Sequence, residues 1–303
     1  MQIKRMENRL WLAVLLLVAA LSLAGCGMSA GNSGGQLSQE QVDGLEKLGK
    51  IKVISREDGS GTRSTFAELA GFAGEGKGAD LTREDAAIAD NADAVVQQVA
   101  GDKAAIGYAS YGTVHSAADV KILAVNGFDV SSGKGSYPLR RSFYLAYSGR
   151  LSDLEQDFLT YVTGAGQELV GKSFGAVAKA DRFVSNQAAG ELRIIGSTSV
   201  TPLISELAGA YERINPHAVI KVVSSDTSDG LTRAMRGECS FGMASRELKD
   251  YEKELLNYRL IAHDDIVVIV NKANPLNSIT LEQLKEIYMG KAISWQDLYQ
   301  NKQ

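Results

Sequence analysis

The sequence predicts an α/β protein with largely parallel strand pairing, because short β-branched runs alternate with segments of helical apolar spacing. The alternation occurs twice, before and after a polar break at residues 184–190. Three turns rich in Ser, Thr and Gly follow strands and open helices, at residues 55–62, 196–199 and 224–230. Since ligands bind at the carboxyl ends of strands in open α/β sheets, these turns are expected to converge on one small ligand.

The elements follow from apolar periodicity, with alternation indicating strands and helical spacing indicating helices. Strands are expected, in chain order, at residues 51–55, 104–109, 121–125, 137–147, 192–195, 219–223, 241–244 and 265–271. Helices are expected at residues 66–72, 87–100, 154–170, 200–214, 230–236 and 279–288.

Composition bounds the class of protein. The chain has 303 residues, of which 45% are hydrophobic and 22% charged, which is typical of a soluble globular protein with one large or two medium domains. The formal net charge is −4, and the first 25 residues carry more basic than acidic groups. The remainder is therefore more acidic still, which argues against nucleic acid as a partner.

The N-terminus predicts a targeting segment. A basic stretch precedes an apolar run at residues 10–23, which is too short to span a membrane comfortably and ends in Leu-Ala-Gly-Cys. This arrangement resembles a bacterial lipoprotein signal, with residues 1–25 removed and Cys26 lipidated; a plain secretory signal or a short anchor helix is the alternative. Residues 26–44 then form a flexible tether on the outer face of the cytoplasmic membrane. Cys239 would be a small buried side chain without a disulfide partner.

The turn at residues 55–62 has the chemistry of an anion site. Gly59 and Gly61 permit backbone angles that place successive N–H groups on one concave side. Ser60 and Thr62 add hydroxyl donors at a helix N-terminus, where backbone N–H groups lack partners. Arg56 adds a bidentate donor. An ordinary capped turn between a strand and a helix explains the same residues without a ligand.

Residues 56–62 read Arg-Glu-Asp-Gly-Ser-Gly-Thr, which matches the Arg-x-Asp-Gly-Ser-Gly-Thr motif of phosphate-binding proteins of ABC importers. The resemblance covers nearly all of residues 45–303, with further matching segments at residues 105–108, 137–141, 196–200, 241–248, 274–281, 288–291 and 295. It implies a two-lobed periplasmic-binding-protein-like clamshell (type II). It also implies a monomeric protein, neither an enzyme nor a cofactor binder, that binds inorganic phosphate or a similar oxyanion and delivers it to an ABC permease.

The order of the segments departs from that family, because the half with the Arg-x-Asp-Gly-Ser-Gly-Thr motif comes first. The sequence therefore reads as a circular permutation, which is tolerated when old termini are close and the new break lies in a surface connection. One lobe is expected at residues 45–138 plus 276–303, and the other at 139–275. Strands near 140–147 and 266–271 would cross between them, and residues 276–303 would pack against 51–110.

The resemblance also implies roles for individual residues. Arg56 would pair with an anion oxygen while Asp58 holds its guanidinium. Hydroxyl and backbone donors would come from Ser60, Gly61, Thr62, Thr198, Ser199, Thr227 and Ser228; for Thr198 and Ser199 simple N-capping is the alternative.

Charged residues near the later turns remain open. Asp226 and Asp229 either cap the following helix or accept a proton from hydrogen phosphate, which would reject sulfate. Arg246 stands where some family members carry a carboxylate, and it either adds positive charge or pairs with Glu247 or Asp250. Arg140 and Arg141 lie at the predicted crossing, where they either line the cleft or lie on the surface, and at least one is expected on the surface.

Other chemistries find little support. His115, His217 and His263 lack metal-ligand spacing, and no nucleophile–base pair is evident. The alternative function is a lipid-anchored sensor or interaction protein of the same fold with altered or lost anion binding, which the acidic 224–230 turn and the permuted order motivate.

Overall fold

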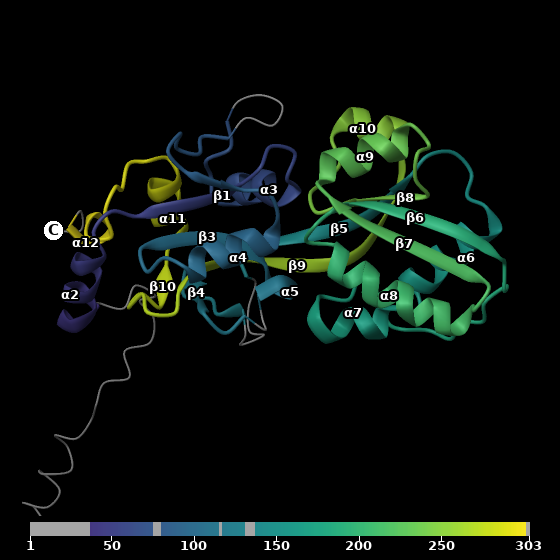
Figure 1. The fold of residues 1–303 in the computed structure, drawn as a ribbon, viewed down its shortest axis with the longest axis horizontal. Coiled ribbons are helices and arrows are strands. Elements are labelled where there is room, and N and C mark those ends of the chain that lie inside the picture. Colours follow the sequence, from purple (N-terminus) through teal and green to yellow (C-terminus); the bar gives the residue numbers. More distant parts are fainter. Residues whose placement is uncertain (1–36, 75–79, 115–116, 131–136, 301–303) are drawn as a thin grey trace, which may run out of the picture. The chain divides into compact units, whose positions relative to one another are not determined.

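The computed structural model describes residues 37–74, 80–114, 117–130 and 137–300 (Figure 1). The predicted signal segment, Cys26 and His115 lie outside these residues. Among the helices of the described part, none is long and apolar enough to cross a membrane.

The described strands form one mixed sheet in the order β2-β1-β3-β9-β5-β8-β6-β7, with β4 and β10 joined beside β9. Pairing is parallel between β1 and β2, β1 and β3, β6 and β7, β6 and β8, and β4 and β10, whereas β5 and β9 pair antiparallel with their neighbours. The strands are β1 Lys52–Arg56, β2 Ala87–Ala89, β3 Ala105–Ser110, β4 Val120–Val125, β5 Arg140–Tyr147, β6 Gly190–Ser197, β7 Ala218–Ser225, β8 Phe241–Ala244, β9 Asn257–Asn271 and β10 Ser278–Ile279.

The helices cover the faces of this sheet and mostly begin at side chains that cap them. Ser60, Asn91, Ser152, Asp226 and Thr280 each accept a hydrogen bond from a first-turn backbone N–H. The helices are α2 Gln39–Leu48, α3 Gly61–Leu69, α4 Ala92–Ala100, α5 Tyr111–Val114, α6 Asp153–Thr163, α7 Gln167–Ser173, α8 Thr201–Ile214, α9 Thr227–Met235, α10 Asp250–Leu255, α11 Leu281–Tyr288 and α12 Asp297–Gln300.

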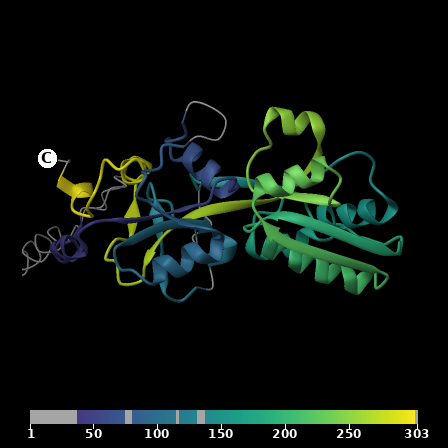
Figure 2. The ribbon, with the colours of Figure 1, turned by 45° about the horizontal axis from the view of Figure 1, so that its top comes forward.

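Strand β9 joins two sets of strands. Its first half pairs with β5 through residues 257–265, and its second half pairs with β3 and β4 through residues 266–271. Figures 1 and 2 show β9 running from β5 to β3 and β4. The strand is longer than the predicted 265–271 segment, because polar residues near its start interrupt the apolar run that the prediction followed.

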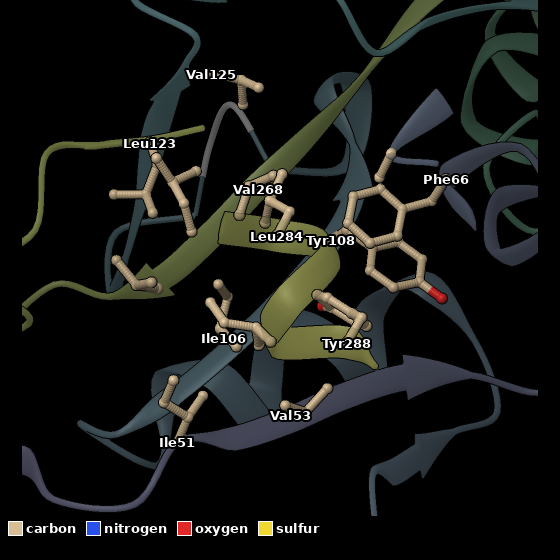
Figure 3. Packing of buried hydrophobic residues seen from close by; sticks show 14 of the residues in the cluster. Ile51, Val53, Phe66, Ile106, Tyr108, Leu123, Val125, Val268, Leu284 and Tyr288 are labelled. Carbon is tan, nitrogen blue, oxygen red and sulfur yellow. The ribbon is translucent and has the colours of Figure 1, made fainter. Parts of the chain in front are cut away.

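Two large apolar clusters lie on either side of this crossing. The first contains buried residues from 45–139 and 266–298, and the second contains buried residues from 143–262. In the first cluster the Phe66 and Tyr108 rings stack with centroids 4.0 Å apart, and Tyr288 packs edge-on against Phe66 at 5.0 Å (Figure 3). The described residues of the 276–303 segment therefore pack against residues 51–110, as predicted.

Three predicted elements differ from the structure. The predicted tether is wrong at its C-terminal end, because α2 begins at Gln39 with a Ser38–Gln41 capping box and buries Leu45. The predicted helix 154–170 is two helices, α6 and α7, with Gly164 ending the first. The predicted helix 87–100 is the short strand β2 followed by α4, because Asn91 is the N-cap of a helix that begins only at Ala92.

Replacing Tyr288 by Ala is expected to lower the free energy of unfolding by about 3–5 kcal/mol, because a fully buried ring is lost from the first cluster. The Tyr288 hydroxyl also donates to the Ile54 carbonyl at 3.2 Å, which Ala cannot do. Urea unfolding measures the change. Leu255→Ala, at a side chain that is largely exposed, serves as control and should change stability by less than about 0.5 kcal/mol. Equal effects of the two substitutions would contradict the packing described.

Candidate functional site

The three predicted turns meet in space. Arg56 Nη2 donates to Thr198 Oγ1 at 3.1 Å, which joins the first turn to the second. Thr62 Oγ1 lies 3.0 Å from Ser199 Oγ in a second bond between these turns. The Ser228 backbone N–H donates to the Gly59 carbonyl at 3.4 Å and joins the third turn to the first. The predicted convergence is confirmed.

Buried hydroxyl groups fill the space where the turns meet. Ser197 donates to Ser245 Oγ at 2.9 Å, and Ser245 Oγ lies 3.3 Å from Thr227 Oγ1. Such groups cost free energy to bury unless they are hydrogen-bonded, so their concentration at one place indicates a polar function. The hydroxyl cluster, as we name it, consists of Ser60, Thr62, Ser197, Ser199, Thr227 and Ser245, each at most 3% exposed.

Two helix N-termini border the hydroxyl cluster. Helix α3 starts at Gly61, directly after its N-cap Ser60, and α9 starts at Thr227, after its N-cap Asp226. A Cβ atom added to Gly61 would lie 2.5 Å from Thr227 Oγ1 and 2.6 Å from Ser245 Oγ. Glycine at residue 61 therefore lets α3 approach the opposite turns closely. The positive ends of both helix dipoles lie beside the same hydroxyl groups.

Arg56 is 2% exposed and lies against the turns, as expected, but its partner differs from the prediction. Glu57 accepts from Arg56 Nε at 2.7 Å and from Nη2 at 2.6 Å. The prediction that Asp58 holds this guanidinium is wrong, because Asp58 accepts from Arg63 at 2.8 Å and its side chain is almost fully exposed. The chain turns sharply at Asp58 and Gly59, which directs the Asp58 carboxylate outward while Glu57 folds back along Arg56.

Arg141 and Asp264 form a second buried ion pair at the base of the cluster. Arg141 Nε donates to Asp264 Oδ2 at 2.9 Å, and Arg141 Nη1 donates to Thr62 Oγ1 at 2.7 Å. Burial raises the pKa of the Asp264 carboxyl and lowers the pKa of the Arg141 guanidinium, while the ion pair opposes both shifts. Arg140, which was named with Arg141 as a residue that could line the cleft, is bonded to Asp265 at 2.8 Å and is the member of the two that lies on the surface.

The carboxylates of the third turn act within their own helix. Asp226 accepts from the Asp229 backbone N–H at 2.9 Å, so the helix-capping alternative is confirmed for Asp226. Asp229 accepts from Arg233, four residues later, at 3.0 Å. Ser228 donates its hydroxyl to the Gly59 carbonyl at 3.3 Å.

Arg246 is buried, but its guanidinium is occupied by a residue that the sequence did not suggest. It donates through Nη1 to Glu252 Oε2 at 2.7 Å and through Nη2 to Glu252 Oε1 at 2.9 Å. The predicted partners were Glu247 and Asp250; of these Glu247 contributes its backbone carbonyl, 2.9 Å from Nη1. Arg246 therefore holds α10, and its Nη2 also lies 3.5 Å from Ser228 Oγ of the third turn.

A cavity of about 840 Å³ is lined in part by Glu57 and Thr198, the two residues to which Arg56 donates. Its lining is polar and includes five carboxylates, from Glu57, Asp90, Asp93, Asp226 and Asp229. Among the described residues no group of His, Cys, Asp and Glu has the arrangement of a metal site, and His263 lies beside Ser142 Oγ at 3.4 Å. Cys239 is half-buried rather than fully buried, and burial raises the pKa of its thiol to about 11.

Several residues of the site were missed from the sequence. Ser197 ends β6 and Ser245 directly follows β8, so the expectation of ligand residues at strand ends, applied to these strands, would have found them. Arg141 was named together with Arg140, and its phase with the buried residues Phe143 and Leu145 is the signal that distinguishes the two. Asp264 carries no comparable local signal.

The converging turns and the crossing strands define a class of protein: a two-lobed α/β fold of the periplasmic-binding-protein type. The chain belongs to the PBP superfamily, whose domain model matches residues 30–165 and 184–303.

Known relatives agree with this assignment. The phosphate-binding protein PstS 2 of Streptococcus pneumoniae TIGR4 is 35% identical over 289 residues, which cover 93% of this chain and 97% of the relative. The PstS 2 protein of Streptococcus agalactiae 2603 V/R is 34% identical over 297 residues, which cover 94% of this chain and 98% of the relative. PstS of Staphylococcus saprophyticus is also 34% identical, but over only 45% of this chain and 44% of its own.

A solved structure shares the fold. The crystal structure of a phosphate-binding protein of a phosphate ABC transporter from Streptococcus pneumoniae TIGR4 has a TM-score of 0.66 and 36% sequence identity. The similarity covers 82% of this chain and all of that chain.

Replacing Glu252 by Gln is expected to lower the free energy of unfolding by up to about 3 kcal/mol at pH 7, because Arg246 loses its buried counter-charge. Burial acts to raise the pKa of Glu252, but hydrogen bonds from Arg246 and the Lys249 backbone outweigh it and hold the pKa below the usual value. The stabilisation is therefore present above the unfolded pKa, about 4.3, and is lost as the pH falls through the folded pKa.

Urea unfolding of wild type and Glu252→Gln between pH 7 and pH 3 measures this effect. The difference between them should shrink below about pH 4. Glu254→Gln, at an exposed position of the same helix, is the control and should behave as wild type at both pH values. A difference that does not depend on pH would contradict the role assigned to Glu252.

Proposed function

We propose that this chain is an extracytoplasmic solute-binding protein that binds inorganic phosphate, or a similar oxyanion, at the hydroxyl cluster. The observation that carries the proposal is the gathering of six buried hydroxyl groups and the buried Arg56 guanidinium at two helix N-termini. Small tetrahedral anions are bound by such donors. The PstS 2 relatives, named phosphate-binding proteins, support this choice of ligand.

The donors proposed for the anion are those that lie on the converging turns. Micromolar affinity needs about 8 kcal/mol, which several charge-assisted hydrogen bonds in a dry site can supply. The proposed ligand residues are Arg56, Ser60, Gly61, Thr62, Thr198, Ser199, Thr227 and Ser228.

The proposed anion binds between two lobes that close over it. One lobe comprises residues 45–138 and 276–303, and the other comprises residues 139–275. A monomer anchored through a lipid on Cys26 at the outer face of the membrane would pass the anion to the permease of an ABC importer. The protein described by the solved relative, a component of a phosphate ABC transporter, supports the transport assignment.

Isothermal titration calorimetry of the mature chain with phosphate, sulfate and molybdate tests the proposal. Phosphate is expected to bind with micromolar or tighter affinity and to raise the melting temperature. Absence of heat with every oxyanion, in protein freed of ligand by unfolding and refolding, would refute transport-type binding.

A second candidate function rests on Glu57. Its carboxylate already occupies two donors of Arg56, so an incoming anion must either compete with it or use the remaining edge of the guanidinium. If Glu57 keeps these donors of Arg56 in the presence of an anion, the chain is a lipid-anchored interaction protein without anion binding. Calorimetry of Glu57→Gln distinguishes these functions, because only the second predicts that binding appears on removing the charge.

Replacing Gly61 by Ala is expected to weaken phosphate binding at least about 30-fold, because the added methyl group meets Thr227 and Ser245 across the site. The free chain should also lose stability, because the added Cβ would lie 2.5 Å from Thr227 Oγ1 and 2.6 Å from Ser245 Oγ, both buried. Calorimetry and thermal melting without ligand measure the two effects.

Gly209→Ala in α8 is the matched control, because its added Cβ would approach only Arg213 Nη1, at 3.9 Å. This variant should bind as wild type. Unchanged phosphate affinity of Gly61→Ala would show that the anion is not bound at the hydroxyl cluster.

A further inference from the structure

Arg141 lies where the two crossing strands meet the hydroxyl cluster. It stands on β5, its partner Asp264 stands on β9, and Ser110 at the end of β3 donates to Asp264 Oδ1 at 2.8 Å. The Arg141 and Asp264 side chains are at most 1% exposed. The pair is therefore a fully desolvated ion pair at the base of the site.

The Arg141 guanidinium contacts Asp264 through Nε and Nη2 and the hydroxyl cluster through Nη1. Nε and Nη2 lie 2.9 and 2.8 Å from Asp264 Oδ2, whereas Nη1 donates to Thr62 Oγ1 at 2.7 Å and lies 3.5 Å from the Ser245 carbonyl. The ring of Phe143, 5.0 Å from the guanidinium carbon, packs against Arg141. Asp264 thus fixes the direction in which the positive charge points.

The bond to Thr62 has a consequence for hydroxyl orientation. Because Thr62 Oγ1 accepts from Arg141, its own proton is directed elsewhere, and in this structure Ser199 Oγ lies 3.0 Å away. An oxygen that accepts from a cation is also a stronger donor. Thr62 is therefore prepared to donate toward a ligand placed between the α3 turn and the Ser199 turn.

We propose that Arg141 supplies a second positive charge to the anion site, with Asp264 as its counter-ion, and that it directs the Thr62 hydroxyl at the ligand. This inference rests on the proposed function. Arg141 is a positioning residue in this scheme, since it acts through Thr62. The charge of Asp264 opposes anion binding, whereas the charge of Arg141 favours it, so the two partners have opposite effects on affinity.

The neighbouring pair on the same two strands provides a matched control. Arg140 donates to Asp265 in the adjacent register, with the Arg140 side chain half exposed and directed away from the cluster. A salt bridge at such a position contributes little. Arg140→Gln and Asp265→Asn should each leave phosphate affinity within about 3-fold of wild type.

The test is calorimetry with inorganic phosphate on the mature chain and its single variants. Arg141→Gln should weaken binding on the order of 100-fold, because it removes a charge-assisted donor and leaves Asp264 uncompensated. Asp264→Asn should bind phosphate as tightly as wild type or more tightly. Arg141→Lys keeps the positive charge but loses the planar guanidinium with its several N–H donors, so this variant should bind phosphate better than Arg141→Gln.

A purely structural ion pair predicts a different pattern, in which Arg141→Gln and Asp264→Asn weaken binding equally because each breaks the same contact. That pattern, or an Arg141→Gln affinity equal to that of Arg140→Gln, would overturn the inference. If Arg141→Gln does not fold, comparison of Asp264→Asn with the double variant Arg141→Gln/Asp264→Asn replaces it. The double variant should then bind at least about 10-fold more weakly than Asp264→Asn.

These outcomes are distinct from failure of the proposed function. Wild type that binds phosphate, together with variants that follow the structural pattern, removes the role of Arg141 alone. Wild type that binds no oxyanion removes the proposed function, and the role of Arg141 with it.

Discussion

A guanidinium group that leaves water must find a carboxylate, and this requirement organises the middle of the molecule. Three arginines are buried among the described residues, and each has a carboxylate partner: Arg56 with Glu57, Arg141 with Asp264, and Arg246 with Glu252. Removing one partner of such a pair costs several kcal/mol, since it leaves an uncompensated buried charge. The Arg56–Glu57 pair therefore orders the first turn, the Arg141–Asp264 pair joins the two crossing strands, and the Arg246–Glu252 pair holds α10 against the end of β8.

Local pairing has a consequence for ligand binding, because it leaves no excess positive charge to attract an anion from a distance. The nearby cavity adds carboxylates rather than cations, and the chain as a whole is acidic. Affinity for an anion must then come from short-range, oriented donors, which are effective only when water is excluded. The structure supplies such donors in the hydroxyl cluster and at the starts of α3 and α9, so discrimination among anions depends on geometry more than on net charge.

The sequence was sufficient to predict which turns meet, but insufficient to predict which side chains pair within them. Strand ends in an α/β sheet lie along one edge, so the meeting of residues 55–62, 196–199 and 224–230 follows from periodicity and topology. The choice between Glu57 and Asp58 depends on the direction of side chains in a turn of positive-φ geometry at Gly59, which periodicity does not report. Asp264 pairs with a residue more than a hundred positions away, and only the register of β5 and β9 brings them together.

The order of the segments matters less to the site than their contacts, and the chain ends show why. Gln296 donates to Glu46 Oε1 at 3.0 Å, and the Trp295 backbone N–H donates to the Gly49 carbonyl at 3.0 Å, so the last described segment lies against the first. Joining these neighbours and opening the chain near 184–190 would reverse the order of the two halves without moving any residue of the hydroxyl cluster. The streptococcal relatives match over more than nine-tenths of both chains, so they have the same segment order as this chain.

The segment near residues 184–190, which connects the two halves of the chain, is itself held in place. Asp157, in α6, accepts from Ser185 Oγ at 2.7 Å, from the Asn186 backbone N–H at 3.0 Å and from the Tyr211 hydroxyl at 2.7 Å. A buried carboxylate with three donors anchors the joining segment to the second apolar cluster, so the segment does not have to be a strand or helix to be ordered. The polar turns lie at or next to strand ends, and strand ends stay where the sheet puts them whichever connection is cut.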